Sequence, residues 1–278
     1  MSKNRAARKE RRARRKQELR SLTRKKSRAT LVIYAVIRVI VLGILVRSAF
    51  TGQTENIFTC LLTLFLLYLP SLVEWKLEIR LPSALEITVI VFIFAAEILG
   101  ELACFYVNVP FWDKALHTVS GFIYAAVGYS LADILNRHHK ISFELSPIFL
   151  AVVAFCFSMT IGAVWEIFEY GVDCILNKDM QKDTIIQQIT SVRLDPTNRN
   201  IPITIGGIED VVVNGEALGL GGYLDVGLHD TMGDLIVNMI GALIFSFIGF
   251  FQQKHQKRSR IAAGFVPQAA EKEGEAHE

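Results

Sequence analysis

Long runs of apolar residues dominate the chain. Six of them show no period-two alternation of the kind that half-buried strands display. A helix needs about 20 residues, at about 1.5 Å each, to cross a hydrocarbon layer of roughly 30 Å. The pattern predicts spanning helices at residues 30–49, 56–73, 84–106, 113–135, 147–176 and 230–252. We therefore expect an all-α integral membrane protein with about six transmembrane helices.

The composition agrees with this pattern. Of the 278 residues, 51% are hydrophobic, and the mean hydropathy of the chain is positive. A soluble domain of this length could bury a core with a smaller apolar share, so the excess indicates a lipid environment. The four cysteines show no CxxC spacing, so they indicate neither a disulfide framework nor a zinc knuckle.

Charged residues mark the parts outside the membrane. Residues 1–29 contain 14 Lys and Arg, which predicts a disordered basic cytoplasmic arm attracted to anionic membrane lipids. No aromatic residues are interleaved to stack on bases, so a nucleic-acid partner is not expected. The predicted organisation is this arm, a membrane domain at 30–252 and a cytoplasmic tail at 253–278.

The short loops predict the orientation. Loops 50–55 and 107–112 contain no Lys or Arg, whereas the alternate loops and the segment after the last span do. The basic residues are Lys76 and Arg80, Arg137 and Lys140, and then Lys254, Lys257, Arg258 and Arg260. Because basic loops stay in the cytoplasm, both termini are predicted to be cytoplasmic.

The remaining loop, residues 177–229, is predicted to be external and is too long for a simple connection. Ile201–Ile205 and Ile208–Val213 are typical of short strands, and Asn214-Gly215 favours a hairpin turn. We expect a small β-containing cap here, with a flexible solvated loop as the alternative.

Ionisable residues within the predicted spans gather near one set of helix ends. Their spacings of three, four or seven residues place the members from each helix on one face. Because successive spans alternate in direction, the predicted topology brings all four groups to the external leaflet. The groups are Glu97 with Glu101, Asp113 with His117, Glu166 with Glu169 and Asp173, and Asp230 with Asp234 and Asn238.

Carboxylates in a membrane need partners, because each costs roughly 2.5–3.5 kcal/mol at the centre of a spanning helix. A divalent cation would neutralise them and could activate water or polarise a phosphoryl oxygen. Mg²⁺, Mn²⁺, Ca²⁺ and Zn²⁺ all suit oxygen ligands with an imidazole. Two other interpretations stay open, namely a proton or ion pathway and a structural network of helix-end caps.

Within the cation hypothesis the residues have different expected roles. Asp113, His117, Glu166 and Glu169 are the expected catalytic groups. The expected metal ligands are Asp113, His117, Glu166, Glu169, Asp173, Asp230 and Asp234. Glu97, Glu101 and Asn238 are expected to orient these ligands through hydrogen bonds without binding the metal themselves. His229 is one position off the Asp230 face, which is typical of a loop residue.

Four segments resemble a known family. They are Trp112–Gly121 (WDKALHTVSG), Trp165–Tyr170 (WEIFEY) followed by Asp173, Asp179–Lys182 (DMQK), and Asp230–Leu235 leading to Asn238 and Gly241. Together they are similar to the YjdF-like inner-membrane proteins, which implies a bacterial multi-pass membrane protein over residues 30–252. A fainter similarity to VanZ-like proteins rests on the Asp-Lys-x-x-His start and on the last span.

The leading hypothesis is an envelope protein that hydrolyses, or transfers a phosphoryl group of, a lipid or lipid-linked substrate at a divalent-metal site. Membrane lipids are the expected partners. The alternatives are a cation or proton transporter and a membrane scaffold without catalysis. The opposite helix ends offer no comparable set of acids, which favours catalysis over transport. No GxSxG, P-loop or HExxH motif is present.

Overall fold

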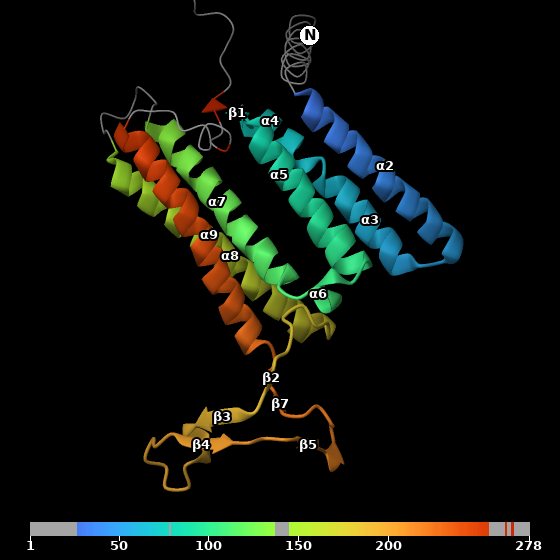
Figure 1. The fold of residues 1–278 in the computed structure, drawn as a ribbon, viewed down its shortest axis with the longest axis vertical. Coiled ribbons are helices and arrows are strands. Elements are labelled where there is room, and N and C mark those ends of the chain that lie inside the picture. The colour runs from blue at the N-terminus through green and yellow to red at the C-terminus, as the bar shows by residue number, and fades with distance from the viewer. Residues whose placement is uncertain (1–26, 78, 137–144, 256–264, 266–267, 270–278) are drawn as a thin grey trace, which may run out of the picture. The chain divides into compact units, whose positions relative to one another are not determined.

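The computed structural model describes residues 27–77, 79–136, 145–255, 265 and 268–269 (Figure 1). Six helices among them are long and apolar enough to cross a membrane, which confirms the predicted fold class. They are α2 (Arg28–Thr51), α3 (Thr54–Leu66) with α4 (Leu69–Leu77), α5 (Ser83–Phe94) with η1 (Ala95–Leu102), α7 (Trp112–Asn136), α8 (Pro147–Leu176) and α9 (Leu228–His255). Most of the predicted basic arm and C-terminal tail, and the loop with Arg137 and Lys140, lie outside the described residues.

Two of the spans are interrupted. The second breaks between α3 and α4, where Pro70 lacks the N–H that a continuous helix would need. The third continues from α5 into a π-helix, η1, where the Ala103 amide donates to the Ile98 carbonyl at 3.0 Å. It ends at Leu102, not at residue 106 as predicted, because Cys104 has a left-handed φ of 57° before the short helix α6 (Phe105–Asn108).

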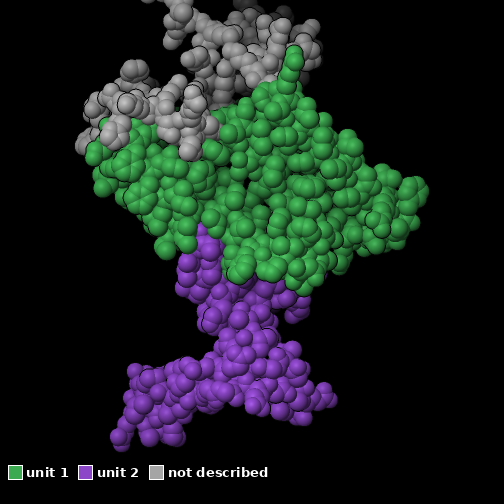
Figure 2. Space-filling view, viewed as in Figure 1, with its two compact units in different colours: residues 1–159, 238–278 green, residues 160–237 purple. Residues whose placement is uncertain are grey.

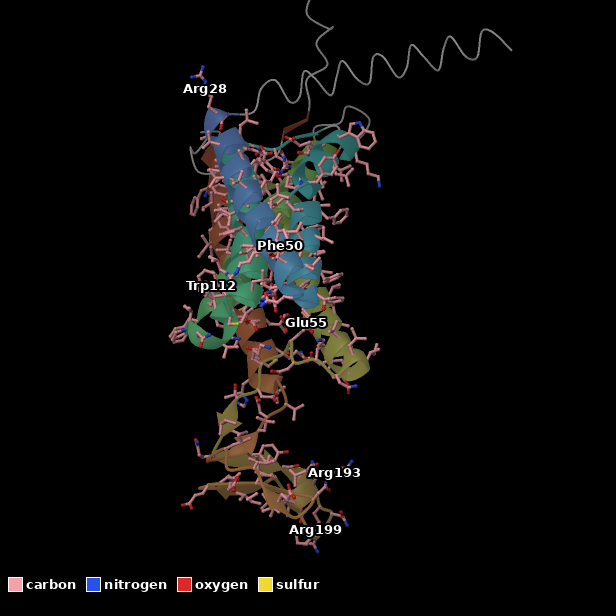
Figure 3. The ribbon with its side chains drawn as sticks, turned by 90° about the vertical axis from the view of Figure 1, so that its right-hand side faces the viewer. Arg28, Phe50, Glu55, Trp112, Arg193 and Arg199 are labelled. Carbon is pink, nitrogen blue, oxygen red and sulfur yellow. The ribbon has the colours of Figure 1, made fainter. Side chains whose placement is uncertain are left out.

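The chain forms two compact units, which Figure 2 colours separately. Unit 1 comprises residues 1–159 and 238–278, and unit 2 comprises residues 160–237. In unit 1, Figure 3 shows Arg28 at one end of the helices and Trp112 at the other. We call these the Arg28 end and the Trp112 end.

The described residues of unit 1 form two hydrophobic cores. The first joins α2, α3, α5 and η1 through residues such as Val41, Cys60 and Ile90. The second joins α7, α8 and α9 through residues such as Ala126 and Phe245. Each group of helices therefore packs around a core of its own.

Glycines allow α7 and α9 to touch in unit 1. A Cβ atom on Gly121 would lie 2.2 Å from the Asn238 carbonyl oxygen, and one on Gly241 would lie 2.0 Å from that of Thr118. No side chain fits at either distance. The hydrophobic effect does not drive helices together within lipid, so spanning helices commonly associate through small residues that allow close backbone packing.

Unit 2 contains three short antiparallel strand pairs. They are β2 (Ile185–Ile186) with β7 (Tyr223–Leu224), β3 (Gln188–Ser191) with β4 (Ile203–Gly206), and β5 (Val212–Val213) with β6 (Glu216–Ala217). Asn214 and Gly215 both have positive φ, at 53° and 91°, as a type I′ turn requires. The predicted hairpin at Asn214-Gly215 is thus confirmed, while β3 is a polar strand that the sequence pattern did not indicate.

One loop of unit 2 is organised around a carboxylate. Asp195 accepts hydrogen bonds from the hydroxyl and amide of Thr197, at 2.6 and 2.8 Å, and from the amides of Arg199 and Ile201. The hydroxyl of Thr197, followed by its amide, lowers the pKa of Asp195 to about 2. The carboxylate therefore holds the turn between β3 and β4 in its ionised form.

Candidate metal and substrate site

In unit 1, the first turn of α7 pairs an acid with an imidazole. His117 Nε2 lies 3.7 Å from Asp113 Oδ1, and Lys114 Nζ lies 3.8 Å from Asp113 Oδ2. Asp113 is favoured there because the free N–H groups of a helix start attract negative charge. His117 is buried, whereas about a quarter of the Asp113 side chain is exposed. The pair is thus accessible from the Trp112 end.

In unit 1, Asn238 of α9 lies beside Gly121, which is one helical turn beyond His117 along α7. The helices α7, α8 and α9 meet at this level. The Asn238 backbone contacts Gly121, whose carbonyl accepts a hydrogen bond from Ser158 Oγ at 2.8 Å. Its Nδ2 points to Met159 Sδ at 3.5 Å, and its buried Oδ1 has no hydrogen-bond partner among the described residues. A buried acceptor without a donor costs about 1–3 kcal/mol, so this oxygen suits a water molecule or a cation.

In unit 2, Glu166 and Glu169 of α8 form a close acidic pair. Each offers a carboxylate oxygen within 4.8 Å of the other, and only 5% and 8% of the two residues are exposed. The Trp165 indole donates to Glu169 Oε1 at 2.9 Å, which orients that carboxylate. Two charges at this separation repel by about 3 kcal/mol at an effective dielectric constant near 20.

The two acids Asp173 and Asp230 of unit 2 bind backbone amides of the loop. Asp173 accepts from the amides of Met180 and Gln181, at 2.6 and 2.9 Å, one on each oxygen. Asp230 accepts from the Lys182 amide at 2.8 Å. These bonds give the segment 179–182 a structural role, since it joins the end of α8 to the start of α9.

The same segment is tied to α9 by side-chain contacts. The Gln181 side-chain amide donates to the Thr231 hydroxyl. A Cβ atom on Gly227 would lie 2.7 Å from Gln181 Cβ, and its φ of 80° also favours glycine. Asp234, one turn after Asp230, is 1% exposed. Among the acids of α9, Asp234 is therefore the buried one.

His229 lies in the first turn of α9, not in a loop as its place off the Asp230 face suggested. Its ring and its amide both bond to Asp225, which precedes α9 and also accepts from the Thr184 amide. Partial burial raises the pKa of Asp225, but the hydrogen bonds from Thr184 and His229 outweigh burial and hold the pKa below its usual value. Asp225 therefore caps α9 as a carboxylate.

Glu97 and Glu101 are set apart from the other acids in unit 1. Both lie on the π-helix η1, where Glu101 is exposed and Glu97 is half-buried. Among the described residues, neither belongs to any group of three or more side chains close enough to share a metal ion. The supporting role expected for them stays a prediction.

Comparison with known proteins identifies the family. Residues 32–255 match the family described as "Predicted membrane protein (DUF2238)", which is most of the chain. The chain belongs to the DUF2238 family. This is the YjdF-like family, so that resemblance is confirmed, whereas nothing in the comparisons supports a VanZ-like relationship.

One curated relative of this DUF2238 protein is an "Uncharacterized protein" from Thermotoga maritima. The two are 31% identical over 84 residues, which is 30% of this chain and 41% of that protein. The chain thus spans less than half the length of this relative. No solved structure matches the DUF2238 chain.

The sequence analysis did not predict the burial of two acids of this DUF2238 protein. Glu86, in the first turn of α5, and Asp133, near the end of α7, are both buried in unit 1 at the Arg28 end. Two buried acids therefore do lie at these helix ends, although they are fewer than the acids predicted at the opposite ends. Glu86 could have been noticed as a carboxylate inside an apolar run, but not as a buried one, because α5 is apolar on every side.

Proposed function

We propose that this protein binds one divalent cation at the Asp113, Glu166, Glu169 and Asp234 side chains, with His117 beside the cation, and acts there on a lipid or lipid-linked substrate. The reaction class is hydrolysis or phosphoryl transfer. Asp173 and Asp230, the other two acids expected as ligands, hold the outer ends of α8 and α9 together by accepting loop amides. Glu97 and Glu101 lie outside the proposed cation site.

The close, buried pair of Glu166 and Glu169 carries this proposal. Two ionised carboxylates within 4.8 Å of one another in a membrane helix are unfavourable unless a positive charge lies beside them. A cation would relieve this repulsion. The Oδ1 atom of Asn238 is a further acceptor that such a cation, or its bound water, would satisfy.

Helix periodicity supports placing the α7 and α8 groups in one site. In unit 1, Gly121 of α7 accepts a hydrogen bond from Ser158 of α8, and the two helices run in opposite directions. Asp113 precedes Gly121 by eight residues and Glu166 follows Ser158 by eight, so each lies about 12 Å further along its helix. Because α8 is one continuous helix, Glu166 and Glu169 fall within about 80° of the Ser158 face.

The same reasoning supports Asp234. Asn238 contacts Gly121 in unit 1, and α9 is continuous from Leu228 to His255. Asp234 is one turn before Asn238 on the same face, just as His117 is one turn before Gly121.

The residues around the cation would have distinct chemical tasks. A bound divalent cation supplies a Lewis acid and lowers the pKa of a bound water. His117, oriented by Asp113, is the group that can take or give a proton at neutral pH. Lys114 beside Asp113 offers a positive charge for a phosphate headgroup. Exposed Trp165, Phe168 and Tyr170 on α8 suit contact with lipid chains.

The orientation is part of the proposal. The distribution of Lys and Arg over the short loops supports cytoplasmic termini, with residues 177–229 outside. The similarity to the YjdF-like inner-membrane proteins supports a bacterial inner membrane. The catalytic groups would then face the external leaflet.

Transport is the second candidate, because Glu86 and Asp133 place buried acids at the Arg28 end as well. The stretch of α7 between His117 and Asp133 argues against a relay. It contains the apolar core residues Ala125, Ala126 and Tyr129. The hydroxyls of its Ser120 and Ser130 donate to carbonyls of their own helix, those of His117 and Ala126. Catalysis therefore stays the preferred function.

Elemental analysis of the detergent-purified protein tests the cation. We expect one equivalent of a divalent metal in the wild type, a loss in Glu166→Ala, and retention in the matched control Glu209→Ala, whose side chain is an exposed loop acid. EDTA should also lower the melting temperature of the wild type, because a bound ligand stabilises the native state. Metal-free wild-type protein that melts identically with and without EDTA would eliminate the site.

A second assay tests the reaction. Purified protein is mixed with vesicles that contain phosphatidic acid or a polyprenyl diphosphate, and released inorganic phosphate is measured. We expect release that EDTA abolishes and that His117→Gln reduces by at least about 100-fold, the usual contribution of a general acid or base. A metal-loaded protein that releases no phosphate from either lipid would refute phosphate hydrolysis while leaving the cation site intact.

A further inference from the structure

The C-terminal segment of unit 1 returns to the helices at the Arg28 end. Strand β8 (Gln268–Ala269) pairs antiparallel with β1 (Ile79–Arg80), which lies in the connection between α4 and α5 (Figure 1). The register pairs Ile79 with Ala269 and Arg80 with Gln268. The chain therefore closes a loop between its last residues and the connection that precedes α5.

Phe265 attaches the same segment to the other group of helices. Its ring packs edge-on against Phe122 of α7, with the ring centroids 5.0 Å apart, and the Phe122 ring packs edge-on against Phe245 of α9 at 5.1 Å. Phe122 precedes the last residue of α7 by 14 positions, or about 21 Å along the helix. Phe265 is half-buried at the edge of the core that α7, α8 and α9 share.

We propose that Phe265, Gln268 and Ala269 form a strap by which the protein docks its own C-terminus and holds its two groups of membrane helices together. One end of the strap packs on the α7–α9 core, and the other extends the backbone of the α4–α5 connection. The docking surface consists of the backbone edge of β1 that pairs with β8 and the face of α7 that carries Phe122.

The two contacts are of unequal strength. A two-residue strand pair is marginal by itself, since isolated two-stranded ribbons are barely stable in water. The aromatic contact supplies most of the attachment, because edge-to-face rings gain packing that lipid chains would not reproduce. The strap is therefore a reversible device: loss of Phe265 packing releases β8 from β1 as well.

Disulfide cross-linking tests the docking in the full chain, after the four native cysteines have been replaced by Ala or Ser. Ile79→Cys with Ala269→Cys should form an intramolecular disulfide under mild oxidation, as the strand register places these positions opposite each other. The matched control pairs Ala269→Cys with Gln53→Cys and should not cross-link, because Gln53 directly precedes α3, whose first-turn residue Glu55 lies toward the Trp112 end in Figure 3. A dimer band in place of the intramolecular product, or no product, would overturn the strap.

Thermal melting tests the anchor. Phe265→Ala should lower the melting temperature by roughly 4 °C, and Phe265→Leu should recover most of that loss. The matched control is Phe50→Ala on α2, whose side chain is 88% exposed, and it should melt like the wild type. In the Ile79→Cys and Ala269→Cys background, Phe265→Ala should also slow cross-linking severalfold. Equal melting of the Phe265→Ala and Phe50→Ala proteins would refute the anchor.

Discussion

Replacement of Gly121 by Ala tests the packing of α7 against α9. The added Cβ would lie 2.2 Å from the Asn238 carbonyl oxygen and 2.9 Å from two further backbone atoms of Asn238. Non-bonded carbon and oxygen atoms do not approach closer than about 3 Å, so the two helices must separate locally by about 1 Å. The obstacle is backbone, which cannot turn aside as a flexible side chain could.

The separation has a calculable effect on stability. Overpacking in a tight interior typically costs about 1–3 kcal/mol. In a protein of this size, such a loss lowers the melting temperature by roughly 2–5 °C. The hydrogen bond from Ser158 Oγ to the Gly121 carbonyl, now 2.8 Å long, would be disturbed at the same place.

The assay is thermal unfolding of detergent-purified protein, followed by tryptophan fluorescence or by aggregation. Gly43→Ala is the matched control, because a Cβ at that position of α2 meets nothing within 4 Å and Ala favours the helix by up to about 1 kcal/mol. We expect Gly121→Ala to melt several degrees below wild type and Gly43→Ala to melt at or above it. If Gly121→Ala melted as the control does, α7 and α9 would not be in direct backbone contact.

Three further outcomes are expected. An impermeant thiol reagent applied to intact cells should label a single cysteine at position 205 or 52 but not at 139, and the reverse pattern would invert the topology. Reconstituted wild-type protein should not move protons or divalent cations across the membrane of sealed vesicles. Asp234→Asn should nevertheless impair the function of the protein in cells. A flux that is present in the wild type and abolished by Asp234→Asn would favour the transport function. Thr197→Val should raise the pKa of Asp195 from about 2 toward its ordinary value near 4, as followed by NMR titration. The pKa of Asp195 is lower in the folded chain than in the unfolded chain, so its contribution to stability should be complete above about pH 4 and lost as the pH falls through about 2. An unchanged titration in the Thr197→Val protein would mean that the Thr197 hydroxyl is not the main hydrogen-bond donor to Asp195.

The membrane helices follow from the sequence because their cause is local. In hydrocarbon each backbone N–H and C=O must be satisfied within the segment, so a long apolar run has no stable alternative to a helix. The hairpin at Asn214-Gly215 is equally local, because two successive residues with positive φ determine the turn. The spacing of Asp113 and His117, or of Glu166 and Glu169, likewise determines that each pair shares a helix face.

Only the tertiary structure shows which side chains and loop segments contact each helix face. A spanning helix is apolar toward lipid and toward protein alike, so its sequence pattern does not separate the two sides, and the burial of Glu86 and Asp133 appeared only in the fold. The use of Asp173 and Asp230 by loop amides depends on a segment that returns to them, which no spacing within α8 or α9 encodes. The packing of Phe265 on Phe122 joins residues 143 positions apart. Such contacts depend on how the chain closes on itself, because their partners are brought together by the packing of whole helices and not by any neighbouring residue.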